Sequence, residues 1–150
     1  MIRMKSLSVK FGVTLVIGLI FGCGEVWGAD WKFFMVGADG TFQWYDTESI
    51  TRYPNRVVRV WIKVIEAKDV IETLKTSKEF QINEIEKMTS RRDHERSLME
   101  LNCIKKTFSL LATVKYDNSG NVKDFIKDSI YNVNIPPESV IEILYKQICK

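Results

Sequence analysis

Two strand-length segments of mixed aromatic and polar residues open the globular part of the chain. They span residues 31–36 and 41–46, and the dipeptide Asp39-Gly40 lies between them. Aromatic residues favour strands, and Asp-Gly is a strong turn signal between two such runs. The pattern therefore predicts a β-hairpin.

Residues 56–65 form the clearest alternating segment, after a Tyr-Pro-Asn turn. One set of alternate positions is apolar: Val58, Val60, Ile62 and Val64. The other set carries Arg59, Trp61 and Lys63, so the pattern predicts a strand with one buried and one mixed face. A mixture of tryptophan and basic side chains is typical of contact surfaces, which makes these three the candidate partner-contact residues. The alternative is a half-exposed Trp61 packed under arginine and lysine stems.

Between residues 68 and 96 the chain becomes highly charged, and its apolar positions change to helical spacing. We expect a helical insertion of one or two surface helices, with Asp69 and Glu72 forming a capping box at the start. Residues 91–96 are predicted to end the insertion as a mixed-charge loop. His94 is then a solvated loop residue rather than a catalytic base.

Strand patterns return in residues 97–103 and 106–116. The turn sequence Asp-Asn-Ser-Gly that follows allows residues 121–128 to pair back on the preceding strand, which gives six strands in total. The last segment, residues 135–149, starts with two prolines and continues with apolar residues at helical spacing. This predicts a C-terminal helix with one apolar side.

The N-terminus has the layout of a bacterial secretion signal. Basic residues precede an almost wholly apolar run, and Cys23-Gly24-Glu25 ends that run before it reaches the roughly 20 residues of a membrane-spanning helix. We expect residues 1–22 to be a signal peptide, extending to residue 28 if cleavage is later. Residues 29–150 then form a single domain.

Removal of the signal changes the charge of the protein. The whole sequence has 22 Lys plus Arg and 19 Asp plus Glu, and the three basic residues of the signal account for the excess: Arg3, Lys5 and Lys10. A neutral domain lacks the net positive field that drives non-specific binding to nucleic acid. Nucleic acid is therefore not an expected partner.

The cysteines fit an exported protein with one disulfide. Cys23 is either lipidated in a loosely fitting lipobox, which would anchor the protein to a membrane, or discarded when a signal peptidase cuts before Ala29. Both routes leave Cys103 and Cys149, and pairing is the default for two thiols in an oxidising compartment. The disulfide would join the end of a strand to the last helix.

These elements predict an α+β fold. It consists of an antiparallel sheet of about six strands, a C-terminal helix packed on one face and disulfide-linked to it, and the charged helical insertion. The sequence lacks the phosphate-binding glycine motifs, the nucleophile elbow of hydrolases and clustered metal ligands. We therefore expect no enzyme activity, no cofactor and no metal.

The order of several short motifs resembles the surface-adhesin protein E family, which consists of small exported bacterial proteins. The motifs are YDTESI at residues 45–50, VRVWIK at 58–63, ELNC at 100–103, IPPES at 135–139 and IC at 148–149. The resemblance runs from Trp31 to the C-terminus apart from the charged middle. It implies a six-stranded antiparallel sheet with a disulfide-bonded C-terminal helix, and an outer-membrane adhesin that binds host matrix proteins and can dimerise. Fold-level similarity does not by itself carry function.

Taken together, the sequence predicts an exported, non-enzymatic binding module of the periplasm, the outer membrane or the cell surface. Its expected partner is an unidentified extracellular or envelope protein, or a second copy of the chain, and membrane contact is expected only through lipidated Cys23. The alternative is a structural envelope component that associates with itself and has no external ligand.

Overall fold

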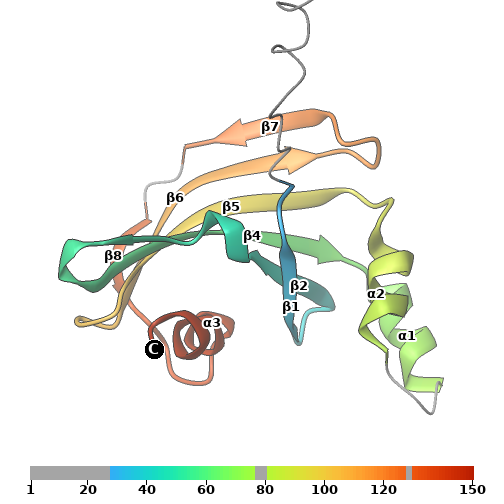
Figure 1. The fold of residues 1–150 in the computed structure, drawn as a ribbon. Helices are drawn as coiled ribbons and strands as arrows, with labels where there is room; N and C mark the ends of the chain where they lie inside the picture. Colours follow the sequence, from blue (N-terminus) through green and yellow to red (C-terminus); the bar gives the residue numbers. More distant parts are fainter. Residues whose placement is uncertain (1–27, 77–80, 128–129) are drawn as a thin grey trace, which may run out of the picture.

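The computed structural model describes residues 28–76, 81–127 and 130–150. The predicted signal peptide, residues 1–22, and Cys23 lie outside these residues. The described chain has an α+β fold, in which an antiparallel sheet carries helices against both faces (Figure 1).

Eight strands form the sheet in the described chain, and all their pairings are antiparallel. The strands are β1 (Trp31–Val36), β2 (Thr41–Asp46), β3 (Thr51–Tyr53), β4 (Val57–Glu66), β5 (His94–Asn102), β6 (Thr107–Tyr116), β7 (Val122–Ile126) and β8 (Ile130–Asn134). Their order is β1-β2-β4-β5-β6-β7, with β3 also paired to β4 and β8 to β6. Two short strands, β3 and β8, were not predicted. β3 pairs with the same edge of β4 as β2 does, and β8 pairs with the same edge of β6 as β7 does. The sheet therefore remains about six strands wide.

The predicted hairpin of β1 and β2 is confirmed, with Trp31 opposite Asp46. Its turn is closed by the amide of Gly37, which donates to the carbonyl oxygen of Thr41 at 2.7 Å. Gly40 in the same turn has φ +89°, a left-handed conformation that glycine adopts without steric cost. The hairpin alternates its side chains between the two faces of the sheet, which lets it join two separate cores.

The first core lies between the sheet and α3 (Val140–Ile148). Its buried side chains are Tyr45, Val58, Val60, Ile62, Met99, Leu101, Leu144 and Ile148. The helix begins at the N-cap Ser139, whose hydroxyl accepts a hydrogen bond from the amide of Glu142. The predicted C-terminal helix and the predicted buried face of residues 56–65 are therefore confirmed.

The second core lies on the other face, between the sheet and the two helices of the charged insertion, α1 (Lys68–Thr76) and α2 (Ile82–Thr89). It contains Phe42, Trp44, Ile65, Ala67, Val70 and Ile85. Figure 1 shows α3 and the α1/α2 pair on opposite sides of the β1–β2 hairpin. The prediction of one or two helices is confirmed. The apolar side of these helices packs on one end of the sheet only.

Two local predictions in the insertion are wrong. Asp69 is not an N-cap, because α1 already begins at Lys68, and the Asp69 carboxylate instead accepts from the guanidinium of Arg92. Residues 91–96 are not all loop, because β5 begins at His94 rather than at residue 97. Pairing with the long strands β4 and β6 extends β5 into this charged sequence.

The Cys103–Cys149 disulfide is confirmed, with 5.5 Å between the two Cα atoms. Cys103 follows the end of β5, and Cys149 is the C-cap of α3. The hydroxyl of Tyr145 adds a second tie, because it donates to the carbonyl oxygen of Cys103 at 2.9 Å. The disulfide therefore pins the last helix to the end of a central strand, as the sequence predicted.

Candidate functional site

The candidate contact residues lie on the face of the sheet opposite α3, which we call the mixed face. In the register of β4 and β5, Arg59 pairs with Glu100, Trp61 with Leu98, and Lys63 with Arg96. The mixed face continues across β6 and β7 through Ala112, Val114, Tyr116 and Phe125. Helices α1 and α2 pack on its β1–β2 end and on the adjoining end of β4. The part near Trp61 and β7 has no helix over it in the described chain.

Trp61 occupies the middle of this face and is partly exposed. It belongs to neither apolar core, although the residues before and after it, Val60 and Ile62, are both buried against α3. The strand alternation that buries those neighbours turns the indole to the other side. Trp61 thus leaves part of its indole exposed on the mixed face.

Arg59 is held in place by an acidic residue. Its Nε donates to a carboxylate oxygen of Glu100 at 2.7 Å, and its guanidinium lies 4.9 Å from the centre of the Tyr53 ring. The hydrogen bond to Glu100 raises the pKa of Arg59. Its charge is therefore locally compensated, and the planar guanidinium is held between Glu100 and the Tyr53 ring.

Lys63 has a different environment from Arg59 and Trp61. Its ammonium lies 4.9 Å from the ring centre of Trp31 and 4.8 Å from that of Trp44. Burial, and secondly repulsion by Arg96, lower the pKa of Lys63. The predicted contact triad is thus divided, since Lys63 points into a pocket next to the exposed part of the mixed face.

That pocket, which we call the cationic pocket, has a volume of about 400 Å³. Four of its side chains form cation–π contacts. The Lys63 ammonium and the Arg96 guanidinium lie 4.9 and 5.3 Å from the ring centre of Trp31, and Lys63 also contacts Trp44. His94 and the α2 residue Glu86 complete the part of the lining that carries ionisable groups. Five separate elements, β1, β2, β4, β5 and α2, therefore converge on one pocket.

His94 is part of this pocket, which corrects its predicted place in a solvated loop. The imidazole stacks on Tyr116 with ring centres 4.9 Å apart, and Nδ1 lies 3.2 Å from the carbonyl oxygen of Arg92. Because a carbonyl only accepts, Nδ1 carries the proton and Nε2 is the bare nitrogen of the neutral ring. Burial is the main cause that lowers the pKa of His94, and Arg96 and Lys63 add to it.

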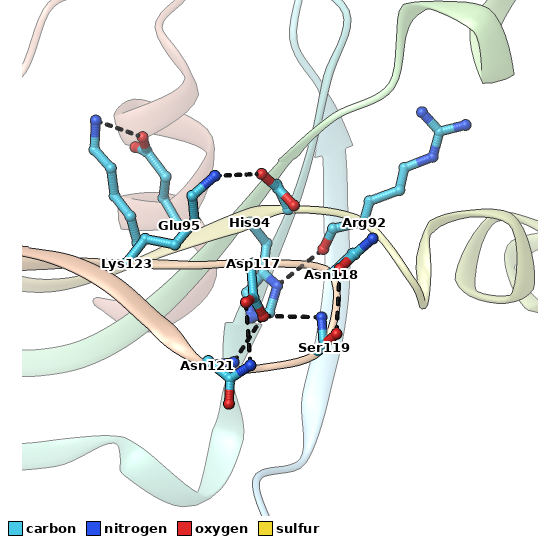
Figure 2. Close-up of polar contacts among 10 residues, drawn as sticks. Arg92, His94, Glu95, Asp117, Asn118, Ser119, Asn121 and Lys123 are labelled. Atoms are coloured by element: carbon cyan, nitrogen blue, oxygen red, sulfur yellow. Dashed lines mark hydrogen bonds and ion pairs between the residues drawn. The ribbon is translucent and has the colours of Figure 1, made fainter.

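A second pocket, of about 560 Å³, lies beside the β6–β7 hairpin, and we call it the paired-charge pocket. Four of its charged side chains form two ion pairs: Lys123 lies 2.8 Å from Asp93, and Lys115 lies 3.3 Å from Glu95. The nearby hairpin turn is tied by Asp117, which accepts from Ser119 and Asn121 (Figure 2). Those hydrogen bonds, foremost the one from the Asn121 side chain, lower the pKa of Asp117. Both lysines of the paired-charge pocket therefore have acidic partners, unlike Lys63 of the cationic pocket.

Sequence reasoning located Arg59, Trp61 and Lys63 on one face but missed Arg96, His94 and Trp44 as members of a site. The crowding of aromatic residues in the first three strands was visible in the sequence. The contribution of β5 was not, because residues 91–96 had the charge pattern of a loop. Only the strand register places Arg96 beside Lys63.

No group of three or more His, Cys, Asp or Glu side chains in the described ranges is arranged to hold a metal ion. None of the helices in those ranges is long and apolar enough to cross a membrane. Comparison with known proteins gives no match to a family model, a curated protein or a solved structure.

Proposed function

We propose that this protein is an exported, non-enzymatic binding module of the bacterial cell envelope, and that the mixed face of its sheet contacts a protein partner. The observation that supports this role is the position of Trp61. A partly exposed tryptophan beside an ordered arginine, on a sheet face that α1 and α2 leave uncovered, has the composition of an interface centre.

The resemblance to the surface-adhesin protein E family also supports the proposal. The order of its motifs coincides here with strands β2, β4 and β5, the start of α3 and the disulfide. We propose that the protein shares the family's role in contacting extracellular or envelope proteins. The residues that would select the ligand lie on the mixed face, and Arg59, Trp61 and Lys63 belong to the VRVWIK motif of the resemblance.

Export supports the same assignment. The basic and then apolar N-terminal segment has the order of a secretion signal, and the disulfide is of the kind that forms outside the cytoplasm. We propose the periplasm, the outer membrane or the cell surface as its location. Globomycin treatment or a Cys23→Ala substitution distinguishes the two routes of processing: altered maturation indicates lipidation, and unchanged maturation indicates cleavage before Ala29.

A second candidate function is a structural envelope component that associates with itself. It is favoured by the outer strands β7 and β8, which expose large apolar side chains: Val122, Phe125, Ile126, Ile130, Tyr131 and Val133. A strand with free backbone groups and exposed apolar side chains can pair with another copy of the same strand. In this case the homodimer would form through the outer edge of the sheet rather than through Trp61.

A binding experiment separates the two functions. The processed protein is tested against immobilised laminin, fibronectin and collagen and against whole cells, while sedimentation measures its mass in solution. We expect saturable, salt-sensitive binding that Trp61→Ala weakens at least about tenfold, as for the centre of an interface. Tyr131→Ala, an exposed aromatic change on β8, is the matched control. Stable self-association without binding to any of these targets would favour the structural function.

A further inference from the structure

The cationic pocket contains buried hydrogen-bonding groups that have no partner. Trp44 Nε1, His94 Nε2 and Arg96 Nε are each buried and make no hydrogen bond in the described structure. All three residues line the cationic pocket, and His94 also borders the paired-charge pocket. Trp44 is only 1% exposed, so its indole N–H can meet a water molecule or a ligand only from inside the pocket.

The charges of the pocket are also incompletely compensated. Within the described residues, no acidic oxygen lies within 4.0 Å of the Lys63 ammonium or the Arg96 guanidinium. Two like charges that share the Trp31 ring repel each other, which is why Arg96 contributes to the lowered pKa of Lys63. An anion between them would relieve this repulsion.

The charge of the lining indicates which anion fits. Lys63 and Arg96 supply two positive charges, Glu86 supplies one negative charge, and neutral His94 supplies none, so the pocket carries one net positive charge. A monoanion balances that charge, whereas a phosphate dianion exceeds it and is repelled by Glu86. Arginine Nε also belongs to the edge that pairs with a flat carboxylate through two parallel hydrogen bonds.

We propose that the cationic pocket binds the carboxylate of a small organic acid, with Arg96 and Trp44 donating hydrogen bonds to its oxygens and Lys63 supplying charge. The volume of about 400 Å³ lies within the range of small-molecule sites. Trp31 and Ile65 provide apolar surface for the rest of the acid. This inference does not depend on the protein-binding role proposed above.

Binding takes up a proton at His94. In the empty pocket Nε2 is a bare acceptor, and it becomes a donor to a carboxylate oxygen only when the ring is protonated. Arg96 and Lys63 oppose that protonation, while Asp93, itself paired with Lys123, favours it. A bound carboxylate offsets the two opposing cations, so the affinity rises as the pH falls from 8 to below the ordinary histidine pKa of 6.5.

The test uses the processed, ¹⁵N-labelled protein with sodium benzoate as the probe and neutral benzamide as its uncharged isostere. The indole N–H signal of Trp44, assigned with Trp44→Phe, is followed by NMR. We expect a saturable shift with benzoate and a Kd of about 10 mM or tighter, the affinity of a ligand of this size with ordinary efficiency. Benzamide should leave the signal in place, and inorganic phosphate should bind more weakly than benzoate.

Substitutions assign the effect to the pocket. Arg96→Met should raise the Kd for benzoate at least about tenfold, because it removes a charged hydrogen bond. Arg91→Met removes the same charge from an exposed residue that does not line the pocket, and should change the Kd by less than about twofold. If Arg96→Met does not fold, the pH dependence tests the site instead. The unmodified protein should bind benzoate more tightly at low pH, and His94→Gln should lack this rise in affinity.

Several results would overturn the inference. An unchanged Trp44 signal in benzoate shows that the pocket is not an anion site, and equal binding of benzamide shows that charge is not recognised. Tighter binding of phosphate contradicts the carboxylate class. Equal weakening by Arg91→Met and Arg96→Met indicates a general effect of net charge.

Discussion

The two faces of the sheet are built from the same strands but finished differently. On the face under α3, alternate residues of β4 and β5 are apolar and meet Leu144 and Ile148, both almost fully buried. On the mixed face, the residues between them include Arg59, Trp61, Lys63, Arg96 and Glu100, and α1 and α2 cover only one end. The first face is closed by packing and a disulfide, whereas the second retains a partly exposed tryptophan and unpaired buried donors.

The two faces divide the work of the domain: the α3 face stabilises the fold, and the mixed face carries the candidate binding residues. Apolar burial on the α3 face stabilises the domain. The unpaired donors and clustered cations of the mixed face cost stability, because buried polar groups without partners lose hydration. Substitutions should therefore affect stability on the first face and binding on the second.

The largest expected effect on stability comes from the disulfide. Replacing both cysteines, in Cys103→Ala/Cys149→Ala, removes a cross-link between residues 46 positions apart. In the chain-entropy model this lowers the free energy of unfolding by about 4 kcal/mol. Urea denaturation of both proteins measures the difference. A loss below about 1 kcal/mol would show that α3 is held by packing alone.

Leu144→Ala tests the packing of α3 directly. Leu144 is 1% exposed and contacts the core formed by β4 and β5. Truncation of a fully buried leucine lowers the free energy of unfolding by about 3 kcal/mol. Ile143→Ala, on the same helix but partly exposed, is the matched control and should cost much less in the same denaturation experiment. Equal costs would contradict the assignment of the buried side of α3.

Trp61→Ala tests the other face. The indole is partly exposed and belongs to neither core, so its removal should lower the free energy of unfolding by less than the roughly 3 kcal/mol of Leu144→Ala while abolishing most partner binding. Denaturation and binding are measured on the same preparation. A stability loss comparable to that of Leu144→Ala would mean that Trp61 is a core residue, and the difference between the two faces would disappear.

The smallest expected effect is the pH dependence from His94. Burial lowers its pKa below the ordinary value of 6.5, so the unfolded chain binds more protons than the folded chain as the pH falls through 6.5. This contribution is absent well above pH 6.5 and destabilises the fold progressively below it. Melting temperatures between pH 8 and 5 should therefore fall slightly more for the wild type than for His94→Gln. Parallel curves would place His94 in solvent.

The sequence predicted most of the fold because most of the strands carry their own signals. The alternation in residues 56–65, the hairpin turns and the helical spacing after residue 139 each specify an element locally. The disulfide followed from the count and the compartment of the cysteines. β3 and β8 were missed because they are short strands that exist only through pairing with β4 and β6.

The cationic pocket was not predictable, because its parts are brought together by register rather than by proximity in the chain. Lys63 and Arg96 are opposite one another only in the pairing of β4 with β5, and Trp31 reaches them only through the hairpin and β2. The charged sequence around His94 also resembled a loop, and pairing with β6 overrides that local pattern.

The most direct test of the proposed function is a photo-crosslink from position 61. A benzophenone amino acid replaces Trp61, or Tyr131 on β8 as the control, in cells that express the protein, and mass spectrometry identifies the covalent products. We expect a product with a different protein from position 61 and little or none from position 131. Products from position 131 alone, formed with a second copy of the chain, would contradict the proposed function.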